Sequence, residues 1–178
     1  MFQTNIARRW LKRGNQTQDV FAKFFFYFSG FNGLYFLWRK IDQLKDTNQK
    51  LHITNLLAKI EEKEASQILN EVRESVEYFC ERPPIQRMDK RSTGSQSQGE
   101  EKEGGEEREI LRNNQLSASD RLAALGRMLY LIRCNLVHGS KTESGDDKEV
   151  IQKSIEPLRL LLEESLKLTD REFGSGAV

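Results

Sequence analysis

The chain has 178 residues, of which 37% are hydrophobic and 31% are charged, and its formal net charge is +1. These values fit one soluble domain, and they exclude a strong overall attraction to nucleic acid or to a membrane surface. Charge is nevertheless uneven, because residues 1–45 are modestly basic and residues 100–109 hold six glutamates. Any electrostatic preference must therefore be local.

The most apolar stretch of the chain, FFFYFSGFNGLYFLW, occupies residues 24–38. A helix that crosses a membrane needs ~20 apolar residues, and this stretch is shorter and is flanked by Lys23 and Arg39. We therefore expect a buried helix, with no membrane partner and no signal peptide. Cys80 and Cys134 are too few for a disulfide framework, so we expect free thiols and a cytoplasmic protein.

Apolar residues recur at helical spacing, and no alternating strand pattern occurs, so the sequence predicts an all-α fold. The first predicted helix begins near Thr17 or Asp19, and one or two helices over residues 48–81 end before Pro83-Pro84. A further helix follows a capping box at Ser117 and Asp120 and ends at Gly139. The last helix covers about 147–168, with a kink or restart at Pro157.

Three segments fall outside these helices. Residues 1–16 are predicted to form a basic N-terminal segment, residues 86–107 a long disordered inserted loop, and residues 171–178 a disordered tail. Residues 86–107 contain one large apolar side chain, too little to offset the entropy of ordering them. The remaining chain, within residues 17–170, predicts an up-down helical bundle of four to five antiparallel helices.

The sequence lacks the motifs of most kinds of active site. There is no glycine-rich phosphate loop, no GxSxG and no HExxH, and no cluster of His, Cys or Asp predicts a metal site, so we expect no metal or cofactor. Arg133 and His138 remain, within LIRCNLVHGSK. Histidine moves protons near neutral pH, and arginine binds phosphate through a planar fork. RNA cleavage without a metal needs a base, an acid and a fixed cation.

The spacing of Arg133 and His138 sets a geometric condition. On one continuous helix a five-residue step turns by about 140°, so the side chains converge only if the helix ends between them or if two subunits share the site. Asn135 lies three positions before His138, where it could orient the imidazole or contact phosphate. Lys141 is a second supporting candidate. His52 stands directly between Leu51 and Ile53, and we interpret it as a structural or partly exposed residue with no catalytic role.

Over about residues 18–170 the chain resembles the HEPN superfamily of all-α nucleotide-binding domains. The resemblance rests on the aromatic-rich first long helix, on an Arg-x4–6-His motif at Arg133 and His138 followed by glycine, and on the leucine-rich last helix. It implies a bundle of four or five helices that forms a homodimer with both motifs at the interface. Many such proteins are metal-independent endoribonucleases of toxin, defence or RNA-processing systems.

The chain departs from the family pattern at two positions. Cys134 follows the arginine where the family often has a polar residue, so the role of Asn135 is in doubt. Ser140 stands where the subgroup paired with nucleotidyltransferase antitoxins usually has tyrosine, so that antitoxin is not inferred. An antitoxin or partner protein of another kind stays open. Since one copy offers one suitable histidine, two-fold pairing would supply the two proton carriers that catalysis needs.

Two functions from different classes follow. The first is a metal-independent endoribonuclease whose partners are RNA and a second copy of the chain, with Arg133 and His138 as catalytic residues. The alternative is a non-catalytic HEPN-like module that binds a nucleotide or a partner protein. In that case the two basic side chains only complement the end of a helix. The near-neutral charge and the lack of a broad basic patch in the sequence keep the alternative open.

Overall fold

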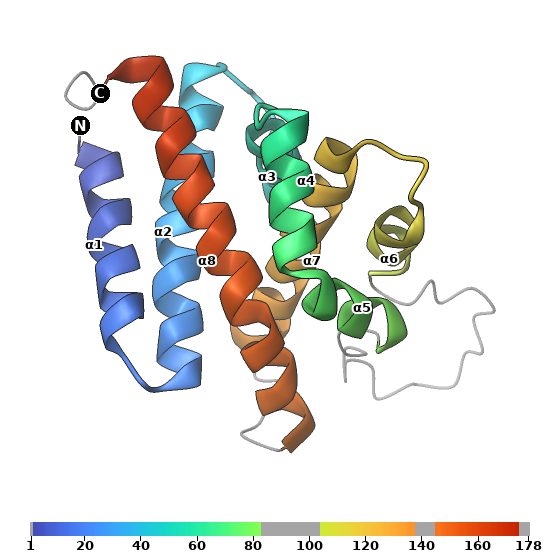
Figure 1. The fold of residues 1–178 in the computed structure, drawn as a ribbon. Helices are drawn as coiled ribbons and strands as arrows, with labels where there is room; N and C mark the ends of the chain where they lie inside the picture. Colours follow the sequence, from blue (N-terminus) through green and yellow to red (C-terminus); the bar gives the residue numbers. More distant parts are fainter. Residues whose placement is uncertain (1, 83–103, 138–144, 175–178) are drawn as a thin grey trace, which may run out of the picture.

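The computed structural model describes residues 2–82, 104–137 and 145–174, which form an all-α helical bundle, as the sequence predicts (Figure 1). The helices of the described part are α1 (Phe2–Gln16), α2 (Val20–Ile41), α3 (Gln49–Leu57), α4 (Glu62–Glu71), α5 (Arg73–Glu81), α6 (Gly105–Arg112), α7 (Ala118–Val137) and α8 (Gly145–Phe173).

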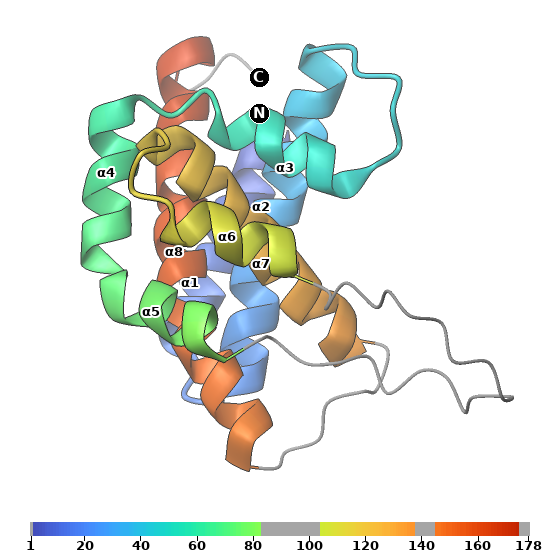
Figure 2. The same cartoon turned by 90° about the vertical axis from the view of Figure 1, so that its right-hand side faces the viewer.

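The helices form two groups, with α1, α2 and α8 in one and α3 to α7 in the other, and the two groups meet at α2, α7 and α8. In Figure 1, α1, α2 and α8 lie side by side, and α1 and α2 form an antiparallel pair joined by a short turn. Figure 2 shows α6 lying across α7, with α3 beside them and α4 and α5 forming the opposite edge. The core is made of apolar side chains from all eight described helices.

Helix α2 is the central helix of the structure. Its predicted start is confirmed, because the Asp19 carboxylate accepts a hydrogen bond from the backbone N–H of Ala22 and caps the first turn. Nine of its residues are buried, chiefly against α1, α3 and α8. At Gly30 a Cβ atom would meet Leu162 of α8 and the carbonyl oxygen of Ala7, so this glycine allows α1, α2 and α8 to approach closely.

By length and composition, α2 is also the one described helix that could cross a membrane. In the structure its buried face carries Phe24, Phe31 and Leu34, which are fully enclosed by protein. This is the packing expected of a buried core helix. The cytoplasmic location stays a prediction.

The N-terminal segment differs from the prediction, because residues 2–16 form helix α1. Ala7 is fully buried, and the indole of Trp10 stacks on Phe26 of α2 with ring centroids 5.6 Å apart. Arg8 forms an ion pair with Asp170 of α8. Gly14 also lies close to α2, because a Cβ atom at this position would collide with the ring of Tyr27.

The disordered loop is predicted over residues 86–107, and the structure shows that its predicted C-terminal end is too late in the chain. Residues 86–103 lie outside the described part of the chain, but α6 already begins at Gly105. Its residue Glu107 is almost fully buried, and its carboxylate pairs with Lys50 of α3 and Arg127 of α7. The composition of this segment predicts a solvated acidic loop. Lys50 and Arg127, which are distant in the sequence, offset the cost of burying the Glu107 carboxylate.

The helix boundaries differ from the sequence prediction in two further places. Residues 48–81 form three helices, α3, α4 and α5, where one or two were expected; the last of them ends at Glu81, before the two prolines, as predicted. Helix α8 continues through Pro157 without a restart and extends to Phe173, into the predicted disordered tail. Phe173 is ordered because its ring packs against Trp38 of α2. Residues 175–178 are outside the described part.

Candidate functional site

The candidate site lies on α7, and the start of this helix is well anchored. Ser117 and Asp120 form the predicted capping interaction, since the Ser117 hydroxyl oxygen accepts from the Asp120 backbone N–H at 3.0 Å. Glu62 of α4 accepts hydrogen bonds from the backbone N–H groups of Ala118 and Ser119, and these bonds lower the pKa of its carboxyl group. The first turn of α7 is therefore joined to the start of α4.

One face of α7 is buried, which determines where the candidate residues point. The side chains of Leu122, Leu125, Leu129 and Ile132 recur at helical spacing on this helix, and all of them are fully buried. Counted at about 100° per residue, Arg133 and Asn135 are separated by about 200° around the helix. The side chains of Arg133 and Asn135 therefore face opposite sides of the helix.

The guanidinium of Arg133 is half-buried and rests over the ring of Phe28 in α2, with its Cζ 5.8 Å from the ring centroid. Such a cation–π contact holds the guanidinium in one orientation while its N–H groups can still donate. In residues 3–82, 104–136 and 148–174, no carboxylate forms an ion pair with Arg133.

Two tyrosines lie near Arg133. Burial raises the pKa of Tyr35 and of Tyr130, and the positive charge of Arg133 partly opposes both shifts. Both phenols are therefore protonated at neutral pH and can donate a hydrogen bond. Tyr130 stands one turn before Arg133 on α7, and its hydroxyl interacts with the Cys134 thiol. The sequence analysis missed Phe28 and Tyr130 as neighbours of Arg133, although the i, i+3 spacing of Tyr130 could have indicated it.

Asn135 is only 2% exposed, and it makes interactions within the protein. A buried amide is well placed to orient a neighbouring backbone or side chain. Both roles expected for Asn135, to orient the imidazole or to contact phosphate, stay predictions.

The other two predicted site residues, His138 and Lys141, lie outside the described part of the chain. The described part of α7 extends to Val137, the residue before His138. Whether the two side chains approach each other stays a prediction.

His52 occupies the structural position expected from the sequence. It is almost fully buried, its Nε2 is 2.8 Å from the carbonyl oxygen of Asp46, and its ring meets the edge of Phe36. In the described ranges no three His, Cys, Asp or Glu side chains come together in a group that could hold a metal ion. The cysteines described as free thiols are Cys80, which is buried, and Cys134, which is half-buried.

In three comparisons with known proteins, no protein-family model, no curated protein and no solved structure matches this chain.

Proposed function

We propose that this chain is a metal-independent endoribonuclease of the HEPN type that cleaves RNA at a site shared by two copies of the chain. The observation that carries the proposal is the state of Arg133. Its guanidinium is held over Phe28, is half-exposed, and has no carboxylate partner among the described residues. An arginine kept in this way is prepared to bind a phosphate group.

Each residue of the proposed site has a distinct task. Arg133 stabilises the negative charge that builds on the phosphate as the 2′-oxygen attacks phosphorus. His138 of one copy takes the proton from the 2′-hydroxyl, and His138 of the other protonates the leaving 5′-oxygen. The products are a 2′,3′-cyclic phosphate and a free 5′-hydroxyl. The phenol of Tyr130 is a further hydrogen-bond donor beside Arg133.

A second copy has an apolar contact available close to this site. Phe25 is 39% exposed, and it neighbours Phe28 on the surface of α2 because the two are three residues apart. Ser29 is small and half-buried on the same side of the helix. A partner helix that covers Phe25 would lie near Arg133, whose guanidinium rests over Phe28. This geometry supports the homodimer that the mechanism needs.

The proposal is tested with purified protein, single-stranded RNA and EDTA. We expect cleavage that leaves cyclic phosphate ends, and we expect His138→Ala and Arg133→Ala each to lower the rate by about 100-fold or more. Arg73→Ala is the matched control, because Arg73 is 77% exposed on α5, away from α7. Light scattering checks that each variant keeps the size of the wild type. Undiminished cleavage by the His138 variant would reject the assignment.

A mixing experiment tests whether the site is shared. His138→Ala chains and wild-type chains are unfolded and refolded together in varied ratios, so that some dimers contain one chain of each kind. Because the proposed mechanism needs His138 from both copies, a mixed dimer should not cleave RNA, and the activity should fall with the square of the wild-type fraction. Activity that falls in direct proportion to the wild-type fraction, with wild type active after the same treatment, contradicts sharing.

The alternative function is a non-catalytic module that binds a nucleotide or a partner protein. One observation favours it: the Arg133–Phe28 contact joins α7 to α2 and would have value as packing alone. A cation–π contact that is partly exposed is worth ~0.5–1 kcal/mol. The alternative predicts that Arg133→Ala lowers stability or assembly and that wild-type protein leaves RNA intact. A folded Arg133→Ala dimer that has lost cleavage would count against it.

A further inference from the structure

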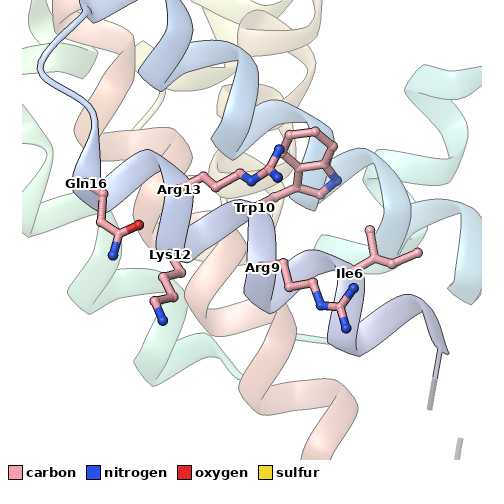
Figure 3. Close-up of a pocket in the computed structure, with 6 residues that line it drawn as sticks. All are labelled: Ile6, Arg9, Trp10, Lys12, Arg13 and Gln16. Atoms are coloured by element: carbon pink, nitrogen blue, oxygen red, sulfur yellow. The ribbon is translucent and has the colours of Figure 1, made fainter.

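The outer face of α1 forms a pocket that the proposed cleavage site does not use. Its volume is about 440 Å³, and within the described residues all of its lining comes from this one helix. Figure 3 shows the side chains of this face, which we call the α1 face: Ile6, Arg9, Trp10, Lys12, Arg13 and Gln16.

The α1 face is positively charged, and its cations are not neutralised. Helix α1 contains no acidic residue. Of its four basic residues, Arg8 pairs with Asp170 on another side of the helix, whereas no carboxylate of the described ranges pairs with Arg9, Lys12 or Arg13. Three positive charges therefore remain on one face of a protein whose net charge is only +1.

The α1 face is also organised before any ligand binds. The guanidinium of Arg13 lies over the indole of Trp10, 5.4 Å from the ring centroid (Figure 3). The indole stacks in turn on Phe26 of α2. This stack of three planar groups limits the rotation of Arg13. A guanidinium held in one plane loses less entropy when it binds a phosphate through two N–H groups.

The spacing of the cations suits a ligand with repeated charges. Arg9 and Arg13 are one helical turn apart, about 6 Å along the axis, and Lys12 lies beside them. A lipid surface fits less well, because a helix lying on a membrane inserts large apolar side chains. The exposed large apolar residues of the described structure are Phe25, Leu51 and Leu116, none of which is on α1.

We propose that the α1 face binds the sugar-phosphate backbone of single-stranded RNA as a docking site separate from Arg133. Both sites contact the first half of α2, where Phe26 contacts Trp10 and Phe28 contacts Arg133. Phe26 and Phe28 are two residues apart and face opposite sides of α2, so the α1 face is distinct from the site at Arg133. The inference rests on the proposed function for its substrate, but its test does not require cleavage.

The test measures the binding of a fluorescent 2′-O-methyl RNA oligonucleotide, which cannot be cleaved, to the full chain by anisotropy. The variant is Arg9→Gln/Lys12→Gln/Arg13→Gln. The matched control is Lys63→Gln/Arg73→Gln/Lys148→Gln, which removes the same charge from exposed positions on α4, α5 and α8. Circular dichroism checks that the α1 variant and the control both fold. If the α1 triple variant does not fold, Arg9→Gln/Lys12→Gln, which keeps the Arg13–Trp10 stack, replaces it.

The expected result is a change in the salt dependence of binding. Each phosphate contact on a single strand contributes about 0.7 to the slope of log K against log salt, so the α1 variant should lose about 2 from the slope. Wild type should then lose ~16-fold more affinity than the variant between 50 and 200 mM salt. The control should keep the wild-type slope.

Other outcomes separate the inference from the proposed function. Wild-type binding by the α1 variant, or an equal loss in the control, overturns the inference even if RNA is cleaved. Loss of binding in the α1 variant upholds it even if no cleavage is seen. Vesicles of phosphatidylcholine with 30% phosphatidylserine and an acidic peptide are tested in parallel. Binding to either one that depends on the α1 face, with none to RNA, also overturns it.

Discussion

The burial of Glu107 leads to a prediction about the stability of α6. Its carboxylate is 3% exposed and lies 3.2 Å from Nζ of Lys50 and 3.5 Å from Nε of Arg127. At an effective dielectric constant of about 20, each pair attracts by roughly 5 kcal/mol, and the desolvation of the ions offsets most of this energy. Glu107→Gln keeps the size of the side chain and removes its charge, which leaves both cations without their shared partner.

The loss of one partner from a buried ion pair costs ~3–5 kcal/mol. Lys50 is 36% exposed and can be rehydrated, whereas Arg127 is largely enclosed. We therefore expect Glu107→Gln to lower the free energy of unfolding by about 2–3 kcal/mol, at or just below the lower limit of the range for a buried pair. For a chain of this length the melting temperature should fall by roughly 5–10 °C.

Urea denaturation and thermal unfolding measure this effect, and hydrogen exchange shows whether the amides of α6 lose protection first. Glu106→Gln and Glu109→Gln are the matched controls, because both side chains are exposed on the same helix and each change removes one negative charge. Each control should change stability by less than about 0.5 kcal/mol. If Glu107→Gln unfolds like the controls, the buried carboxylate does not hold α6 against α3 and α7, and the reasoning is wrong.

Two further predictions concern the core and the start of α7. Phe31 is fully buried, so Phe31→Ala should cost about 3–5 kcal/mol in urea denaturation, whereas Phe25→Ala, at an exposed position, should cost clearly less; equal losses would contradict the assigned packing of α2. The pKa of Glu62 is lowered by the backbone N–H groups of Ala118 and Ser119. Its stabilising effect is therefore present above the ordinary pKa of 4.5 and is lost as pH falls through the lower, folded-state pKa. In acid titrations followed by circular dichroism, Glu62→Gln should show a smaller loss of stability below pH 4.5 than wild type; an unchanged profile would refute the capping role.

The elements best predicted from the sequence are those whose signal is local. Helical periodicity determines the direction of a buried stripe, so the apolar residues of α7 could be named before the structure was known. Capping is local in the same way, because Ser117 meets a backbone group three residues away, and the Asp19 cap of α2 does likewise. Proline limits the residue before it, which accounts for the end of α5.

The elements that were missed depend on contacts between distant segments. Helix α1 is ordered by Ala7, Trp10 and Arg8 against residues of α2 and α8 that are far away in the sequence. The burial of Glu107 depends on Lys50, 57 residues earlier, and on Arg127. No local pattern distinguishes this glutamate from its solvated neighbours. The extension of α8 to Phe173 likewise depends on Trp38.

For the candidate site, the same physical reason separates what the sequence predicts from what only the tertiary structure shows. The sequence alone is enough to predict Arg133 and His138 as its chemical groups, because residue type and spacing are properties of a short stretch. Only the tertiary structure decided that Phe28 supports the guanidinium, that Asn135 is buried, and that three cations of α1 share an open face. Exposure and electrostatic pairing are set by which segments pack together, and that packing is determined by the whole chain.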